Sequence, residues 1–192
     1  AYEITTGDWS SDVCSADLLV LRQGPYMALT KHEFDEREQQ LLLEIEEKLS
    51  YPMFVKPSNM GSSVGITKVK TREDLKKAID TAAIYDYRIL IEEGIDCREL
   101  ETGVLGNRDP QVSGVGEIIP SAEFYDYKAK YFDGGQSKLC IPADIPAEKV
   151  EEIRSIAARA YSLLDCSGYA RADFFMDRRA GKILLNEINS IP

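Results

Sequence analysis

The sequence predicts a mixed α+β fold in which short antiparallel strands form hairpins and helices flank the sheets. Two patterns support this prediction. Short apolar segments come in neighbouring pairs joined by turn residues, and longer segments place apolar residues at helical spacing. No internal repeat or low-complexity linker interrupts the 192 residues. A hydrophobic fraction of 44% and a charged fraction of 29% are typical of a globular chain that buries a core.

The first 22 residues are an exception to this regular pattern. They show neither a helical nor a strand period, and Gly7 to Asp12 resembles a turn. The stretch from Ser10 to Leu18 also resembles the peptide that arises when sequencing adapter is translated. We therefore expect residues 1–22 to be an atypical segment, and we hypothesise that it is not native.

Regular elements begin after Pro25. A short strand is predicted over 26–29, and a helix follows from Thr30 to Leu49 with acidic residues in its early part. The apolar face of this helix is formed by Leu41, Leu42, Ile45 and Leu49. Strands over 52–56 and 66–69 flank a Gly/Ser loop at 58–65, so we expect them to form a hairpin.

The remaining segments continue the alternation of helices and paired strands. A Thr-x-x-acid pattern at 71–74 predicts the cap of a helix that runs to about Tyr85. Pro146 is expected at the first position of a helix to about Leu164. Residues 121–138 form a polar, aromatic loop that is long enough to suggest a function. Further strands are predicted over 88–92, 99–105, 112–119, 170–177 and 182–188.

Charge and composition exclude several classes of function. The formal net charge of -10 argues against extended binding to nucleic acid, which needs a basic face, but a few cations and a metal can still hold a nucleotide. The single histidine, His32, is typical of a helix start or a surface, so the sequence offers almost no residues for histidine-based catalysis. No apolar run reaches the roughly 20 residues of a membrane helix. No secretory signal is visible, so a cytoplasmic location is the default expectation.

The segment from Phe54 to Gly65 is the first candidate site. Lys56 ends an apolar strand, which holds its ammonium on a rigid base, and Gly61 and Gly65 let backbone N–H groups of the loop approach an anion. The glycine spacing matches neither a Walker loop nor a dinucleotide-binding fingerprint. The segment predicts a phosphate-binding loop, and the alternative is an ordinary Gly/Ser hairpin turn.

Two further segments carry groups suited to ligand binding. The strand end at 92–95 offers backbone groups to an adenine edge, and Glu99 offers a carboxylate to ribose hydroxyls, although solvated acids at a strand end are the alternative. The polar loop from Tyr125 to Tyr131 holds two lysines and three tyrosines. There Lys130 is placed to meet a γ-phosphate and the tyrosines to close as a lid, unless the loop is simply an exposed surface.

The strongest pattern lies on the final hairpin. Residues i and i+2 of a strand share a face, so Arg171 and Asp173 point the same way, as do Glu187 and Asn189. If the two faces match, three oxygen ligands converge beside one arginine, and oxygen ligands suit Mg²⁺. The alternative is a set of edge salt bridges. Mostly apolar residues are expected on the opposite face, namely Ala172, Phe174, Leu185 and Ile188.

These four segments, in this order, resemble the ATP-grasp ligases, and in their details the D-alanine–D-alanine ligases, from about Pro25 to Pro192. The most specific pieces are VKPSNMGSSVG at 55–65, FYDYKAKY at 124–131, GYARAD at 168–173 and NEIN at 186–189. The resemblance implies an ATP-grasp fold with the nucleotide held between two subdomains. It implies a small central subdomain over 23–95 and a truncated C-terminal subdomain over 96–192.

The resemblance also implies a role for each matching residue. Two Mg²⁺ ions, or Mn²⁺, would be held by Asp173, Glu187 and Asn189. Arg171 would stabilise charge at the reacting acyl centre, and Ser62 would link the phosphate loop to Tyr131 of the lid. The lid itself would contain Tyr125, Tyr127 and Tyr131. The residues implied to contact ATP are Lys56, Ser62, Ser63, Glu92, Glu93, Ile95, Glu99 and Lys130.

The activity implied is the ATP-dependent joining of two D-alanines for peptidoglycan precursor synthesis, through an acyl phosphate. The implied partners are ATP and D-alanine, without nucleic acid or membrane, and full-length members are usually homodimers. The family's N-terminal substrate domain and the segment after Pro192 are not in this sequence, so we expect little or no ligase activity from the chain. Three alternatives stay open: another ATP-grasp carboxylate–amine ligase, a non-catalytic nucleotide-binding fragment, and a purely structural α+β domain.

Overall fold

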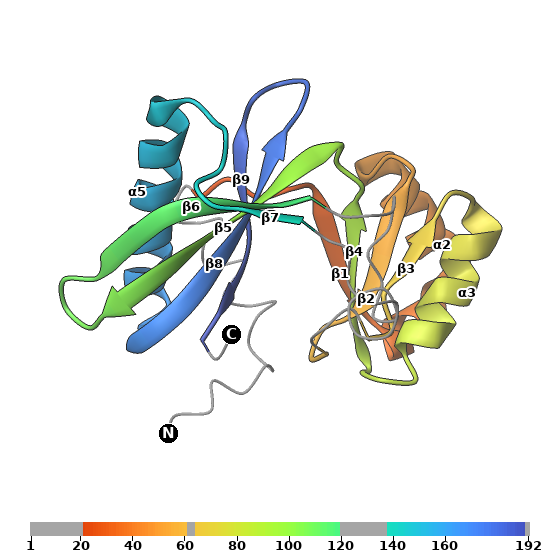
Figure 1. Cartoon of the computed structure of the whole chain (residues 1–192). Helices are drawn as coiled ribbons and strands as arrows, with labels where there is room; N and C mark the ends of the chain where they lie inside the picture. The colour runs from red at the N-terminus through yellow and green to blue at the C-terminus, as the bar shows by residue number, and fades with distance from the viewer. Residues whose placement is uncertain (1–20, 61–63, 120–137, 191–192) are drawn as a thin grey trace. The chain divides into compact units, whose positions relative to one another are not determined.

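The computed structural model of the protein describes residues 21–60, 64–119 and 138–190. These residues form two compact units, which are drawn in Figure 1. The N-terminal unit contains Gly24–Gly94, and the C-terminal unit contains 21–23 together with the described residues from Ile95 onward. Each unit holds one antiparallel sheet in its described part, which confirms the predicted α+β class.

The N-terminal unit has a four-stranded sheet in the order β1-β4-β2-β3. The predicted hairpin of β2 and β3 is confirmed, with Val55 opposite Thr67. Its elements are β1 (Tyr26–Thr30), α2 (Lys31–Lys48), β2 (Met53–Pro57), β3 (Thr67–Val69), α3 (Arg72–Ala82) and β4 (Arg88–Glu93). The α3 helix ends three residues before the predicted Tyr85, because the chain closes a turn in which the Tyr85 N–H donates to the Ala82 carbonyl at 3.0 Å.

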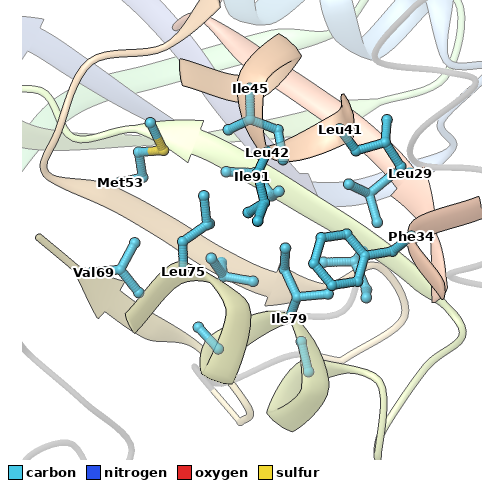
Figure 2. Packing of buried hydrophobic residues seen from close by; sticks show 14 of the residues in the cluster. Leu29, Phe34, Leu41, Leu42, Ile45, Met53, Val69, Leu75, Ile79 and Ile91 are labelled. Carbon is cyan, nitrogen blue, oxygen red and sulfur yellow. The ribbon is translucent and has the colours of Figure 1, made fainter. Parts of the chain in front are cut away.

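The core of this unit lies between the sheet and the two helices (Figure 2). Along β2 the burial alternates, so Met53 and Val55 are buried while Phe54 and Lys56 are only partly buried. The predicted apolar face of α2 packs into this core through Leu41, Leu42 and Ile45, with Leu49 just beyond the helix end. Each fully buried aliphatic side chain contributes roughly 1.5–3 kcal/mol of hydrophobic free energy. The alternation also leaves Lys56 on the face opposite the core.

Both helices of this unit begin at a threonine that caps them. The Thr30 hydroxyl accepts from the Glu33 N–H at 3.2 Å while the Glu33 carboxylate accepts from the Thr30 N–H at 2.8 Å. Thr71 caps α3 in the predicted way, accepting from the Asp74 N–H at 3.2 Å. The α2 helix is less regular than expected, because Arg37 has φ -131° and ψ 31°. None of residues 35–40 is buried, so no packing enforces helical geometry there.

The C-terminal unit has a five-stranded sheet in the order β7-β6-β5-β8-β9, with α5 packed against it (Figure 1). Its elements are β5 (Cys97–Gly106), β6 (Gln111–Ile119), β7 (Lys138–Cys140), α5 (Ala147–Leu163), β8 (Gly168–Asp177) and β9 (Ile183–Asn189). The buried side chains Leu100, Val104 and Phe174 come from the sheet. Tyr161 of α5 is also buried, and its hydroxyl donates to the Gly106 carbonyl at 2.6 Å.

Two local expectations for this unit are wrong. Pro146 has extended ψ (143°) and is the residue before α5, so it occupies the cap position rather than the first helical position. The strand β7 was not expected, because its three residues follow a polar segment and make an edge strand by pairing Cys140 with Glu117. No helix in the described ranges is long and apolar enough to cross a membrane.

The predicted final hairpin is confirmed, with a β-bulge that was not predicted. Asp173 lies opposite Glu187, whereas the next residue of β8, Phe174, lies opposite Leu185. Asn186 is therefore an extra residue in β9, and the register shifts there. The shift explains how Leu185 and Ile188, three residues apart, both pair with residues of the apolar face.

Candidate functional site

The described residues include nine of the positions that the sequence singles out. In the N-terminal unit these are Lys56, Glu92 and Glu93; in the C-terminal unit they are Ile95, Glu99, Arg171, Asp173, Glu187 and Asn189. The other positions lie outside the described residues, so their roles stay predictions: Ser62, Ser63, Tyr125, Tyr127, Lys130 and Tyr131.

Lys56 and Glu92 form an ion pair on the face of the N-terminal sheet that is opposite the core. Lys56 lies opposite Leu90, and Glu92 lies opposite Phe54, so the two charged residues are diagonal neighbours on adjacent strands. The Lys56 ammonium is 2.8 Å from a Glu92 carboxylate oxygen, and the side chains are 22% and 29% exposed. The ammonium is thus held on a rigid strand, accessible to an anionic ligand.

The end of β4 is fixed by close backbone contacts. A Glu93 carboxylate oxygen accepts from the Ser50 N–H at 2.7 Å, so this side chain already has a structural partner. The Gly94 N–H donates to the Pro52 carbonyl at 2.7 Å, and a Cβ at Gly94 would lie only 2.7 Å from that oxygen. Glycine is therefore required at this point, which the sequence reasoning missed. The predicted adenine contacts of Glu92, Glu93 and Ile95 stay predictions.

In the C-terminal unit the final hairpin brings its polar residues together as predicted. Arg171 lies opposite Asn189, and Asp173 lies opposite Glu187. The Arg171 guanidinium donates to both Asp173 oxygens, at 2.7 and 2.8 Å. The Asn189 amide donates to Asp173 at 2.9 Å and to Glu187 at 3.2 Å. One arginine, two carboxylates and one amide therefore form a single hydrogen-bonded group on one face of the sheet.

Burial makes it costly to keep the Asp173 carboxylate of this group charged. The pKa of Asp173 is raised to about 6, mainly by burial; Arg171 opposes this rise, and the nearby carboxylates of Glu187 and Glu101 add to it. The hydrogen bonds to Asp173 raise the pKa of Arg171 above its ordinary value. The desolvation of Asp173 is therefore only partly offset by its arginine partner, so a further positive charge at this carboxylate would be favourable.

The sequence reasoning missed Glu101, which belongs to the same face. Glu101 lies directly opposite Asp173, on the other side of that residue from Glu187. Its carboxylate is 3.5 Å from the Arg171 Nε. The signal was present in the sequence, because Glu99 and Glu101 are two residues apart on one strand and so share a face.

The donor chemistry of this group suits a hard divalent cation. The carboxylates of Asp173 and Glu187 and the carbonyl oxygen of the Asn189 amide are the oxygen ligands that Mg²⁺ accepts, with phosphate oxygens and water completing its shell. Within the described ranges, no three or more His, Cys, Asp or Glu residues are grouped so as to hold a metal by themselves. A cation here would therefore depend on the asparagine and on oxygens from a ligand.

Solved structures define the class of protein to which this fold belongs. The chain resembles the D-Ala:D-Ser ligase VanG from Enterococcus faecalis, with a TM-score of 0.84, 35% identity, and coverage of 98% of this chain and 53% of that one. It also resembles the D-alanine-D-alanine ligase from Coxiella burnetii, with a TM-score of 0.79, 30% identity, and coverage of 98% and 49%. The fold is thus the α+β ATP-grasp fold of these ligases.

The chain belongs to the D-alanine–D-alanine ligase family, because residues 17–192 match the family model described as "D-ala D-ala ligase C-terminus". The match begins inside the segment 1–22 that was expected to be atypical. A D-alanine--D-alanine ligase of Thermoanaerobacter sp. (strain X514) is 60% identical over 146 residues, which cover 76% of this chain and 41% of that protein. The ligase of Acetivibrio thermocellus is 54% identical over 170 residues, which cover 88% and 45%. The chain therefore spans less than half the length of these two relatives.

Proposed function

We propose that the chain is the ATP- and metal-binding part of a ligase that joins two D-alanines through an acyl phosphate, in the synthesis of peptidoglycan precursors. The observation that carries this proposal is the hydrogen-bonded group of Arg171, Asp173, Glu187 and Asn189, in a chain of this family. Such a group combines oxygen ligands for a cation with a permanent positive charge, and phosphoryl transfer depends mainly on charge neutralisation and positioning.

The proposed reaction has two steps. In the first, a carboxylate oxygen of one D-alanine attacks the γ-phosphorus of ATP, the bond from that phosphorus to the bridging oxygen breaks, and ADP leaves. In the second, the amine of another D-alanine attacks the acyl carbon, the nitrogen loses a proton, and phosphate leaves. Bound Mg²⁺ would neutralise charge on the phosphate oxygens. The acyl phosphate hydrolyses readily in water, so the tyrosine-rich segment 125–131 would serve as the lid that excludes solvent.

Each candidate residue would have its own role in this reaction. Lys56 would bind the α- and β-phosphates, since Glu92 already holds its ammonium on the face of the sheet opposite the core. Arg171 would stabilise the negative charge that develops on the acyl oxygen in the second step. Asp173, Glu187 and Asn189 would hold two Mg²⁺ ions, with Mn²⁺ as a substitute. Roles from the resemblance are proposed for the remaining residues: Glu92, Glu93 and Ile95 at the adenine, Glu99 at the ribose, Ser62, Ser63 and Lys130 at the phosphates, and Tyr131 in contact with Ser62.

Nucleotide binding tests the proposal directly. We expect ATP with Mg²⁺ to raise the midpoint of thermal unfolding, since a ligand at about 100 times its Kd stabilises the folded state by about 2.7 kcal/mol. Asp173→Asn should reduce the Mg²⁺-dependent part of this shift, whereas Glu151→Gln, which removes an exposed carboxylate of α5, should not. Absence of any ATP-dependent shift in the unsubstituted chain would contradict the proposal and favour a purely structural domain.

A ligase with another second substrate is the main alternative, and it has specific support. VanG, whose sequence is 35% identical to that of this chain, is named a D-Ala:D-Ser ligase. A substrate panel scored by phosphate release distinguishes the two, provided that the full-length protein is used. Highest turnover with D-alanine as both substrates supports the first proposal, whereas preference for D-serine favours the alternative. ATP binding without turnover on any amino acid would favour a non-catalytic nucleotide-binding role.

Three further properties follow from the proposed function. Use of ATP for precursor synthesis places the protein in the cytoplasm, which fractionation would test. A homodimer is proposed for the full-length protein, and sedimentation of that protein would test it. The expectation that the 192-residue chain alone has little or no ligase activity stays a prediction. An ADP-release assay with D-alanine tests that expectation, and clear turnover would contradict it.

A further inference from the structure

Three carboxylates lie in one row across the C-terminal sheet. Glu101 on β5 is directly opposite Asp173 on β8, and Asp173 is directly opposite Glu187 on β9. Directly opposed residues of an antiparallel pair project to the same side of a sheet. The row thus contains one carboxylate, Glu101, to which neither the sequence patterns nor the proposed function assigns a role.

Arg171 touches two members of this row. Its guanidinium makes short hydrogen bonds to Asp173, at 2.7 and 2.8 Å, and a longer ion-pair contact of 3.5 Å from Nε to a Glu101 oxygen. Within the described ranges, Glu101 is the only other carboxylate that makes an ion pair with Arg171. The strand position opposite Arg171 on β5 is Gly103, which has no side chain to come between Arg171 and Glu101.

The Asp173 carboxylate has little capacity left for a cation in this arrangement. Its Oδ1 accepts from Arg171, and its Oδ2 accepts from both Arg171 and Asn189. A divalent cation at Asp173 would repel the guanidinium and compete for the same oxygens. An arginine displaced within a partly buried site needs another anionic partner, because an unpaired charge there is costly.

We propose that Glu101 is a positioning residue that receives the Arg171 guanidinium when Asp173 binds a divalent cation. The proposal rests on the metal site of the proposed function. The Nε–H of Arg171 then moves from Asp173 to Glu101, a change of partner on the same face of the sheet. Arg171 stays beside the cation site and keeps its charge directed at the ligand, so Glu101 links cation binding to the placement of the arginine.

A magnesium titration of the 192-residue chain tests this change of partner. The probe is MgCl₂, added at constant ionic strength to the chain with a fixed concentration of a non-hydrolysable ATP analogue that supplies phosphate oxygens. The readout is the ¹H–¹⁵N NMR signal of the Arg171 Nε–H, identified by its loss in Arg171→Lys. In the unsubstituted chain we expect a saturable shift of this signal, with the proton still protected from solvent exchange at saturation. Retention of protection is the specific result, because the Arg171 Nε–H needs a new hydrogen-bond acceptor once the cation has bound the Asp173 carboxylate.

The Glu101→Gln variant supplies the comparison. We expect its titration to need a roughly tenfold higher Mg²⁺ concentration, as for the loss of one charge-assisted hydrogen bond. We also expect the Arg171 signal to lose its protection at saturation, which a general loss of negative charge would not cause. Glu151→Gln on α5 removes one exposed carboxylate from the same unit and should titrate like the unsubstituted chain.

Three outcomes overturn the inference, and they are distinguishable. If the unsubstituted chain shows no saturable shift, the metal site itself is wrong, and the proposed role of Glu101 is wrong with it. If the shift is saturable but Glu101→Gln gives the same titration and the same protection, only the role of Glu101 is wrong. Should the variant not fold, loss of protection at saturating Mg²⁺ in the unsubstituted chain still overturns the inference.

Discussion

Lys56 and Glu92 sit on adjacent strands of the N-terminal sheet, with the lysine ammonium 2.8 Å from a carboxylate oxygen. Both side chains are partly exposed, so solvent screens the pair and its contribution to stability is on the order of 1 kcal/mol. We therefore predict that Lys56→Gln changes the free energy of unfolding little but removes most of the thermal shift caused by ATP, because a phosphate-binding cation is lost. Differential scanning fluorimetry with and without ATP and Mg²⁺ measures both effects.

Lys77→Gln is the matched control for that experiment. Lys77 pairs with Glu73 at 2.8 Å on the surface of α3, and both side chains are largely exposed. Its substitution should leave the ATP shift unchanged. A Lys56→Gln variant that keeps the full shift would show that this ammonium does not contact the nucleotide.

Arg98 and Glu117 form a bidentate ion pair in the C-terminal unit, and they support a prediction about acid stability. The guanidinium donates to both carboxylate oxygens at 2.6 Å, and Glu117 is buried. These hydrogen bonds lower the pKa of Glu117 below its ordinary value of 4.5. We expect Glu117→Gln to cost roughly 1.5–3 kcal/mol near neutral pH, as for a hydrogen bond between charged groups.

The pH dependence of this pair follows from the sign of the shift. The folded state holds its proton less tightly than the unfolded state, so the pair contributes fully above pH 4.5 and its contribution is lost as the pH falls through the lowered pKa. In urea unfolding across this pH range, the free energy of unfolding should fall more steeply with decreasing pH for the unsubstituted chain than for Glu117→Gln. Equal slopes would mean that Glu117 does not titrate in this way.

Two isoleucines near the end of α3 give a direct test of the N-terminal core. Ile79 is fully buried in the cluster of Figure 2, whereas Ile84 is 78% exposed just beyond the helix. We predict that Ile79→Ala lowers the free energy of unfolding by about 2–5 kcal/mol, because it leaves a cavity. Ile84→Ala should change it by no more than about 0.5 kcal/mol. Comparable losses in urea denaturation would argue against this packing.

Gly65 closes the loop that follows β2, and its backbone supports a fourth prediction. It has φ +76°, and an added Cβ would lie 2.7 Å from the Tyr85 ring. Gly181 has a similar φ of +63°, yet an added Cβ there would meet no atom within 4 Å. Both alanine substitutions should cost about 1–2 kcal/mol through the left-handed backbone, and Gly65→Ala should cost about 1 kcal/mol more through overpacking.

The Tyr85→Ala background separates these two contributions. In that background the excess cost of Gly65→Ala over Gly181→Ala should largely disappear, because the ring contact is gone. Thermal unfolding of the four variants provides the comparison. An excess that persists without the Tyr85 ring would assign the cost to the loop backbone instead.

The final hairpin shows what sequence reasoning achieved here. The pattern of polar and apolar residues over 170–177 and 182–188 was sufficient to predict both strands and the pair that shares a face on each, Arg171 with Asp173 and Glu187 with Asn189. The reason is physical: a strand with one buried face must alternate, and alternation specifies which side each residue occupies. That the two faces coincide was only a condition, and it is met through the bulge at Asn186. Helical spacing of apolar residues likewise predicted the buried face of α2, and the Thr-x-x-acid pattern predicted the cap at Thr71.

Features that depend on pairing partners escaped prediction. Glu101 was overlooked because its importance comes from lying opposite Asp173, and nothing in the sequence states that β5 pairs with β8. The edge strand β7 was missed since three mostly exposed residues carry no hydrophobic pattern, and its existence depends on backbone pairing with β6. The irregularity at Arg37 was missed because helix propensity does not reveal where packing is absent.

The bulge at Asn186 sets the face of the sheet that the residues after it occupy. Counting outward from Leu185 without the bulge, strict alternation would turn Glu187 and Asn189 toward α5 and leave Ile188 in solvent. The extra residue therefore lets Leu185 and Ile188 face the core while Glu187 and Asn189 face the proposed cation site, and deletion of Asn186 would straighten the strand without moving these side chains to the other face.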